Sequence, residues 1–170
     1  VYEAMAPENF DAAALDYAEG HLRILSGLYG MLRPLDRVQP YRLEMGYRFA
    51  PEGVRSLREF WKARLTEALR QELSAQAEPV VVNLASKEYS DAIDLKALPG
   101  KVITPVFKVK QGSDPARQVA IYAKRGRGAL AGYLCRQQAG IAPLTDFAED
   151  GWRYQPTDST AAAPLFIREL

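Results

Sequence analysis

A helical stripe that leads directly into a buried β-like run is the feature that most constrains the fold of this chain. From Val54 to Gln76, apolar side chains recur every three or four residues, the spacing that lines one face of an α-helix. Pro79 then stops the helix, and Val80–Ser86 (VVVNLAS) has the length and composition of a buried strand. A helix followed by a buried strand is typical of α/β domains, in which helices cover a sheet.

Further segments of both kinds repeat this alternation along the 170 residues. We expect another helix from about Asp11 to Glu19 and one from Gly126 to Gly140. We expect a short helix within KEYSDAI. Strands are predicted at His21–Gly27, Lys101–Val109, Arg117–Lys124, Phe147–Pro156 and Ala163–Leu170. The pattern therefore predicts one α/β domain over residues 1–170, with a mixed sheet flanked by helices.

The net charge of +1 hides an uneven distribution of charged residues. Residues 101–140 carry eight basic residues and one acidic residue, and residues 21–48 carry five arginines and two acids. Such clustering favours an anionic partner, although a solvated basic surface would have the same composition. No apolar run reaches about 18 residues, so we expect no membrane-spanning helix and no membrane partner.

One cysteine, Cys135, and one histidine, His21, limit the chemistry that is open to the chain. A single cysteine forms no internal disulfide and suits a reducing cytoplasm. We predict no zinc or other metal site and no cofactor. Iron binding through carboxylates alone stays an open, weaker alternative, because such ligands give modest selectivity. A catalytic Ser-His-Asp set would have to use His21, the only histidine of the chain. The GxxxxGK[ST] phosphate-binding loop does not occur.

The segment YAKRGRG (Tyr122–Gly128) is the strongest local signal for a ligand. We predict that a strand delivers Lys124, Arg125 and Arg127 to the start of a helix. Free N–H groups and a partial positive charge at a helix start suit phosphate, and arginine adds forked donors. A flexible basic turn is the alternative interpretation.

The segment SGLYGMLRPLDRVQPYRLEMG (Ser26–Gly46) fixes its backbone with glycines and prolines around charged residues. SGLYG is similar to the glycine hairpin with which helix-hairpin-helix modules offer N–H groups to a DNA phosphate. Alternatively, Pro34 and Pro40 hold a charge network at the wall of a cleft, made of Arg33, Asp36, Arg42 and Glu44.

A third group of polar residues, NLASKEY, follows the predicted strand that begins at Val80. Asn83, Ser86, Lys87 and Glu88 could hold a ligand at the strand end, whereas Ser86 and Tyr89 could instead be a helix cap and a packed aromatic. A pair of catalytic acids could be drawn from Asp36, Glu44 and Glu88, but nothing in their spacing requires it. Whether the chain is an enzyme stays open at this point.

Four blocks occur in this order along the chain: HLRILSGLYGMLRPLDRVQPYRLEMG (His21–Gly46), VVNLASKEYSDAI (Val81–Ile93), PVF (Pro105–Phe107) and YAKRGRGALAGYL (Tyr122–Leu134). Together they resemble the YaaA family of bacterial peroxide stress proteins. The resemblance covers nearly the whole chain from about Asp16 onward, and the first block is long and particular to the family.

The resemblance implies a cytoplasmic protein of the oxidative stress response that limits damage from unincorporated iron. It also implies DNA binding through a basic cleft and a helix-hairpin-helix-like element at Ser26–Gly30. The phosphate-binding residues that it implies are Gly27, Gly30, Arg33, Arg42, Lys87, Lys124, Arg125 and Arg127. The alternative is an enzyme that acts in the same cleft on a nucleotide, nucleic acid or other phosphorylated ligand. Protein partners are unknown from the sequence.

The chain departs from the family pattern in two places. Family members open with a strand and a SPAKT-like motif that is absent here, so we expect the chain to be N-terminally incomplete. Gly126 stands where the family has an alanine, and Ala131-Gly132 stand where a basic residue is often present. The second departure predicts the loss of one phosphate contact.

Overall fold

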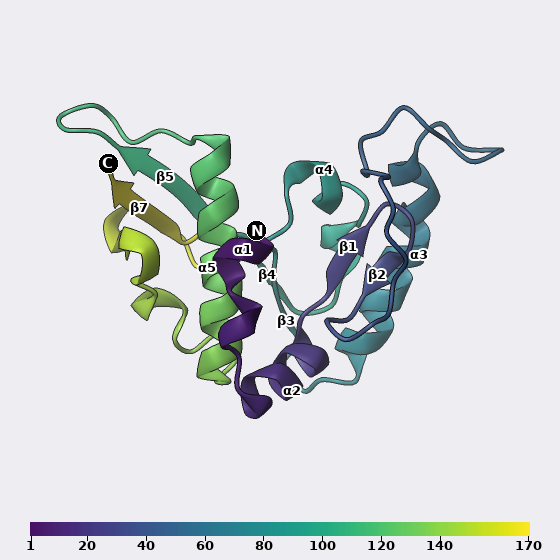
Figure 1. The fold of residues 1–170 in the computed structure, drawn as a ribbon, viewed down its shortest axis with the longest axis horizontal. Helices are drawn as coiled ribbons and strands as arrows, with labels where there is room; N and C mark the ends of the chain where they lie inside the picture. Colours follow the sequence, from purple (N-terminus) through teal and green to yellow (C-terminus); the bar gives the residue numbers. More distant parts are fainter. The chain divides into compact units, whose positions relative to one another are not determined.

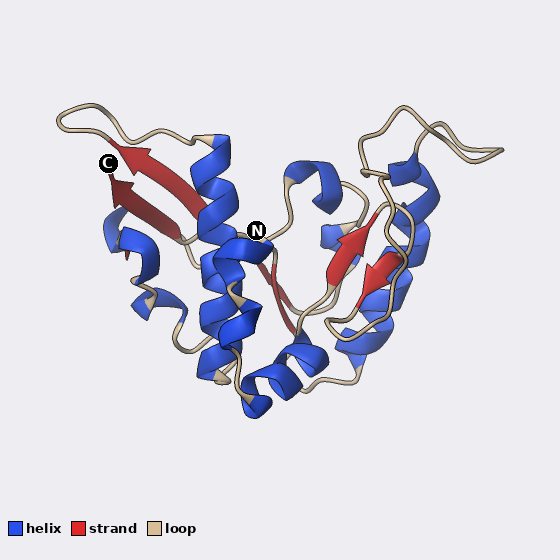
Figure 2. Ribbon diagram, in the orientation of Figure 1, coloured by secondary structure: helices blue, strands red, loops and turns tan.

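The computed structural model describes all residues from Val1 to Leu170 and divides them into two compact units. The first unit comprises residues 1–18, 82–84 and 103–170, and the second comprises residues 19–81 and 85–102. The helices are α1 (Tyr2–Met5), α2 (Ala12–His21), α3 (Leu57–Ser74), α4 (Lys87–Ser90) and α5 (Ala120–Gln137). The strands are β1 (Ile24–Ser26), β2 (Gly30–Leu32), β3 (Val80–Val82), β4 (Lys101–Ile103), β5 (Val106–Lys110), β6 (Trp152–Tyr154) and β7 (Leu165–Glu169) (Figures 1 and 2).

The first unit is built on a mixed three-stranded sheet in the order β5-β7-β6. Strands β5 and β7 run parallel, with Phe107 opposite Phe166, and β6 runs antiparallel to β7. Alternate residues of β5 are buried, so one face of the sheet supplies the core. Phe107 stacks on Phe166 at a ring-centroid distance of 5.4 Å and meets Trp152 edge-on at 5.0 Å. The α/β class and the mixed sheet are thus confirmed.

Helix α5 lies along β5 on the buried face of this sheet (Figure 1). A side chain on Gly126 would collide with the ring of Phe107, which itself is almost fully buried. Gly128 faces the carbonyl of Val1 in the same way, and α1 packs on α5. Small residues inside α5 therefore allow its close approach to its neighbours.

The second unit packs the hairpin β1–β2 and the helices α3 and α4 around an apolar core. The buried members of this core are Met45, Leu57, Leu65, Leu73, Ala92, Ile93 and Leu98. Helix α3 begins after Ser56, whose hydroxyl accepts a hydrogen bond from the backbone N–H of Glu59 at 3.2 Å. The stripe predicted from Val54 to Gln76 is thus a helix, three residues shorter at its start and two at its end.

Strands β3 and β4 pair with each other as a separate two-stranded sheet. The backbone N–H of Asn83 donates to the carbonyl of Ile103 at 2.7 Å, and that of Lys101 donates to Pro79 at 3.0 Å. The predicted strand at Val80–Ser86 is confirmed for its first three residues, after which the chain turns toward α4.

The prediction of a strand at Arg117–Lys124 is wrong, because α5 already begins at Ala120. Val119, Ile121 and Tyr122 are β-branched or aromatic residues that favour strands, and the glycines at positions 126 and 128 are poor helix formers. Burial of the small residues of α5 against β5 and α1 outweighs these local preferences.

The helix-hairpin-helix element is not confirmed. Residues 27–29 form a tight turn between the antiparallel strands β1 and β2, in which Ser26 is paired with Gly30. The tight turn expected at the glycines is present, but the elements on either side of it are strands.

Candidate functional site

The predicted site residues belong to both units. Those in the second unit are Gly27, Gly30, Arg33, Asp36, Arg42, Glu44, Ser86, Lys87 and Glu88. Those in the first unit are Asn83, Lys124, Arg125 and Arg127. A single cleft that holds all of them stays a prediction, and the two sets are described separately below.

The hairpin turn packs against Trp61 of α3 through its glycines, Gly27 and Gly30. The indole N–H of Trp61 donates to the carbonyl of Gly27 at 2.9 Å. Gly30 has a φ of +79°, and a side chain there would come within 2.5 Å of the Trp61 ring. Both glycines are buried, so packing alone explains why no other residue fits here. Their role in phosphate binding stays a prediction.

Ser26 joins this turn to the long loop that follows β2. Its hydroxyl accepts hydrogen bonds from the backbone N–H groups of Tyr29 at 2.9 Å and Leu28 at 3.2 Å. The hydroxyl of Tyr41 lies 2.5 Å from the same oxygen. The rings of Tyr29 and Tyr41 meet edge-to-face at 5.4 Å, so a loop without regular secondary structure is held in a defined place.

Asp36 and Arg33 close a turn at Pro34. The carboxylate of Asp36 accepts from the backbone N–H of Arg33 at 2.8 Å, and the N–H of Asp36 donates back to the carbonyl of Arg33 at 3.2 Å. The guanidinium of Arg33 lies 3.8 Å from Glu72, which also pairs with Arg23 at 2.8 Å. Of the four residues of the predicted charge network, only Arg33 forms an ion pair, and its partner is Glu72 of α3; Asp36 binds the backbone of Arg33 instead.

Glu88 ties the same loop to α4. Its carboxylate accepts a hydrogen bond from the backbone N–H of Gly46 at 2.6 Å. Burial raises the pKa of the neighbouring Tyr89 phenol, and the negative charges of Glu88 and Glu44 raise it further. Asp36 and Glu88, two of the three acids considered for catalysis, therefore both bind backbone N–H groups.

Ser86 and Lys87 lie at the start of α4. Ser86 precedes the helix without a capping hydrogen bond from its side chain, although its carbonyl accepts from the N–H of Ser90 at 2.8 Å. Tyr89 packs against the core of the unit, as expected for the packed aromatic. The ammonium of Lys87 pairs with Asp91 at 2.8 Å, and this contact lowers the pKa of Asp91. Lys87 is thus already partly neutralised.

Three arginines of the long loop are exposed and take part in none of the ion pairs of the structure: Arg37, Arg42 and Arg48. Among these three arginines, only Arg42 is a site residue predicted from the sequence. The alternation of these arginines with Tyr41, Tyr47 and Phe49 is the signal that would have selected the other two.

In the first unit, Lys124, Arg125 and Arg127 lie in the second turn of α5 and beyond, not at its start. The prediction that these residues lie at a helix start is therefore wrong, because the free N–H groups of α5 lie nearer Ala120. The basic side chains themselves remain candidates.

These three cations differ in how far they are available to an anion. Lys124 is exposed, whereas Arg125 lies 3.7 Å from Asp150, which also pairs with Arg168 at 2.8 Å. Arg127 is half-buried, donates to the carbonyl of Ala123 at 3.2 Å, and has its pKa lowered by burial. Lys124 is therefore an exposed cation that no acid of the structure pairs with, unlike Arg125.

Asn83 lies just after β3. Its side-chain amide donates to the hydroxyl of Thr104 at 3.4 Å, so it links the ends of β3 and β4. This contact is structural and leaves the proposed ligand role of Asn83 a prediction.

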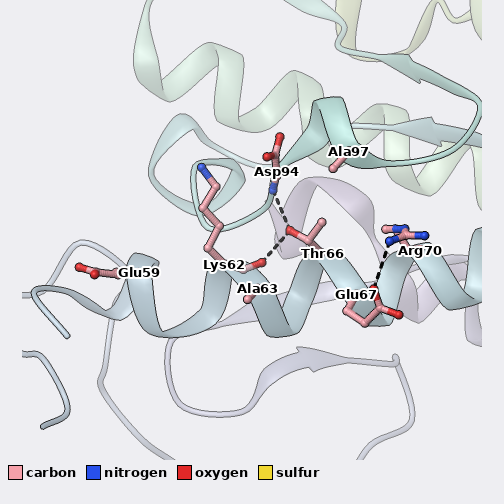
Figure 3. Close-up of a pocket in the computed structure, with 8 residues that line it drawn as sticks. All are labelled: Glu59, Lys62, Ala63, Thr66, Glu67, Arg70, Asp94 and Ala97. Atoms are coloured by element: carbon pink, nitrogen blue, oxygen red, sulfur yellow. Dashed lines mark hydrogen bonds and ion pairs between the residues drawn. The ribbon is translucent and has the colours of Figure 1, made fainter. Parts of the chain in front are cut away.

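A shallow hollow of about 440 Å³ lies between α3 and residues 94–97 (Figure 3). None of the predicted site residues lines it. Its lining residues are Glu59, Lys62, Ala63, Thr66, Glu67, Arg70, Asp94 and Ala97. Thr66 donates to the carbonyl of Lys62 at 2.6 Å and accepts from the N–H of Asp94 at 2.9 Å (Figure 3). Three acids against two bases make this hollow a poor site for a phosphate.

The structure contains neither a cluster of metal-binding side chains nor a helix that could cross a membrane. No three side chains among His, Cys, Asp and Glu come together in a way that could hold a metal ion. The helices are all too short or too polar to cross a membrane.

Comparison with known proteins identifies the family of the chain. A family model described as peroxide stress protein YaaA matches residues 1–158. A UPF0246 protein of Cellvibrio japonicus is 45% identical over 170 residues, one of Shewanella amazonensis is 42% identical over 171, and one of Caulobacter vibrioides is 43% identical over 169. Each alignment covers 99% of this chain and 66% of the relative, so the chain spans about two thirds of their length. The chain therefore belongs to the family of the peroxide stress protein YaaA.

Proposed function

We propose that this chain acts in the peroxide stress response as a DNA-binding protein that limits the damage done by unincorporated iron. Membership of the YaaA family supports the peroxide stress role. The proposal implies a cytoplasmic location, because bacterial DNA lies in that compartment. The DNA contacts go to backbone phosphates, which carry no sequence information, so binding is expected on all sequences alike.

The observation that carries the proposal is the set of accessible cations in each unit. In the first unit, Lys124 is exposed on α5, next to Arg125, which is only loosely paired at 3.7 Å. In the second unit, Arg42 is exposed and without an ion pair. Lys and Arg side chains of this kind release counterions when they neutralise phosphates, and this release drives non-specific binding to DNA.

The same mechanism links DNA binding to iron. Ferrous iron is a divalent cation and joins the counterions that collect around DNA phosphates. A protein that neutralises phosphates with its own cations displaces those counterions. Peroxide then meets less iron at the DNA surface, so fewer hydroxyl radicals form beside the sugars. This mechanism does not require the protein to bind iron itself.

Duplex binding measured at several salt concentrations tests the DNA-binding part. The variant Lys124→Ala should bind all duplexes more weakly and reduce the log–log salt slope by about 0.9. Lys96→Ala is the matched control, because Lys96 is an exposed lysine outside the predicted site. The proposal would be contradicted if the wild type and the Lys124 variant had equal log–log salt slopes, or if the affinity did not depend on salt concentration.

Plasmid nicking by ferrous iron and hydrogen peroxide tests the protective part. The wild-type chain and Lys96→Ala should protect supercoiled plasmid, whereas Lys124→Ala should protect it less at equal protein concentration. Radical scavenging by the protein would be the same for all three chains. Equal protection by all three would therefore attribute the effect to scavenging and contradict the counterion mechanism.

A further inference from the structure

The loop between β2 and α3 exposes large aromatic side chains that a folded domain normally buries. Tyr41, Tyr47 and Phe49 are 42%, 62% and 51% exposed. We call residues 37–49 the aromatic–arginine segment. Loops of this length without secondary structure are uncommon in compact domains and are usually functional or disordered. Large aromatic side chains that are exposed and follow one another closely along the chain favour a binding surface at this loop.

Hydrogen bonds hold parts of this segment in place, so the aromatic side chains are presented from a defined backbone. The hydroxyl of Tyr41 is bonded to Ser26, and its ring is braced edge-to-face by Tyr29. The N–H of Gly46 is held by Glu88, and Met45 is buried in the core beside it. The backbone N–H of Phe49 donates to the carbonyl of Tyr47 at 2.8 Å.

Cations alternate with these rings. Arg37, Arg42 and Arg48 are exposed and have no ion-pair partner, while Asp36, next to the segment, is occupied by the N–H of Arg33. The segment itself contains these three arginines and one acid, Glu44. A partner must therefore offer flat apolar faces and negative charge at close spacing.

We propose that the aromatic–arginine segment binds single-stranded DNA by stacking unpaired bases on Tyr41, Tyr47 and Phe49, while its arginines neutralise the phosphates between those bases. This inference rests on the proposed DNA-binding function and adds a preference for unpaired bases. Every base has a π-face, so stacking of this kind tolerates any sequence. A purely apolar protein partner fits less well, because it would bury three guanidinium groups without an anion.

The test compares two 15-residue oligonucleotides that carry the same phosphates, oligo(dT) and a strand made only of abasic sites. The full chain should bind oligo(dT) more tightly than the abasic strand. The double variant Tyr47→Ala/Phe49→Ala should lose about fivefold or more in oligo(dT) affinity for each ring removed. Its affinity for the abasic strand should not change. Tyr47→Phe keeps the ring and should keep wild-type binding.

Three other outcomes would each overturn the inference, and each points to a different explanation. Equal wild-type affinity for the two strands, or an unchanged double variant, removes base stacking but leaves salt-dependent duplex binding intact. If the double variant binds DNA like the wild type but sediments with a different oligomeric mass, the segment instead makes contacts between copies of the chain. Failure to bind duplex, oligo(dT) and abasic strand alike removes both this inference and the proposed function. Melting curves confirm that the variants are folded.

Discussion

The carboxylate of Glu88 and the backbone N–H of Gly46 lie 2.6 Å apart although 42 residues separate them in the sequence. This hydrogen bond connects the first turn of α4 to the end of the aromatic–arginine segment. Gly46 suits the contact, since a side chain there would come within 2.9 Å of the Glu88 carboxylate. A charge-assisted hydrogen bond to the backbone thus holds a loop that has no β-sheet hydrogen bonds of its own.

Replacement of Glu88 should therefore loosen the loop and change the titration of Tyr89. Glu88→Ala should lower the free energy of unfolding by about 1 kcal/mol, because the N–H of Gly46 loses its partner. Glu88→Gln keeps an acceptor and should lose less. Both variants remove a negative charge beside Tyr89, whose pKa is raised mainly by burial and also by Glu88. The pKa of Tyr89, followed by NMR of ring-labelled tyrosine, should fall; an unchanged value would contradict this account.

Alanine substitutions at Gly30 and Gly53 distinguish the stability cost of backbone strain from the cost of steric overlap. Both have a positive φ, +79° and +83°, but only Gly30 faces Trp61, whereas Gly53 has open space around it. Gly53→Ala should cost about 1 kcal/mol of stability from the left-handed backbone alone. Gly30→Ala should cost about 3 kcal/mol, because the new methyl group also displaces the Trp61 ring. Urea denaturation measures both; equal losses would mean that the hairpin moves away from α3 without penalty.

The sequence predicts α3 and most of the strands because their signals are local. Apolar spacing from Val54 to Gln76 and the run at Val80 need no knowledge of distant residues. The start of α5 could not be found in this way. Its β-like residues near Ile121 and its glycine at position 126 both argue against a helix, and only contact with Phe107 and α1 explains it.

The candidate site shows the same division between local and distant information. The tight turn at Gly27 and the Arg33–Asp36 turn follow from nearby glycine and proline residues. The pairing of Arg33 with Glu72 and that of Glu88 with Gly46 each join residues about 40 positions apart, which no spacing rule indicates. The alternation of Arg37 and Arg48 with aromatic residues is a local signal for a ligand-binding segment, but only the structure shows that both arginines are exposed and form no ion pair.

Asp150 restrains the cations of the first unit, so its removal should strengthen DNA binding. Its carboxylate lies 2.8 Å from Arg168 and 3.7 Å from Arg125. Asp150→Asn keeps a side chain that tolerates the positive φ of 51° at this position and frees Arg125 to meet a phosphate. We expect higher duplex affinity and a steeper salt dependence. Asp114→Asn is the control, since it makes the same charge change in an exposed loop of the same unit. An equal gain from both variants would indicate only a net-charge effect.

Cys135 should not respond directly to peroxide while the chain is folded. Residue Cys135 is 5% exposed in α5, and burial raises the pKa of its thiol, so little reactive thiolate is present at neutral pH. Thiolate character and exposure together control oxidation to sulfenic acid. We expect slow reaction with hydrogen peroxide and with an aromatic disulfide reagent in buffer, and fast reaction with the reagent in urea. Mass spectrometry of the peroxide-treated native chain provides the measurement. Rapid addition of oxygen to Cys135 in the folded chain would show that α5 opens readily and would make the thiol a candidate peroxide sensor.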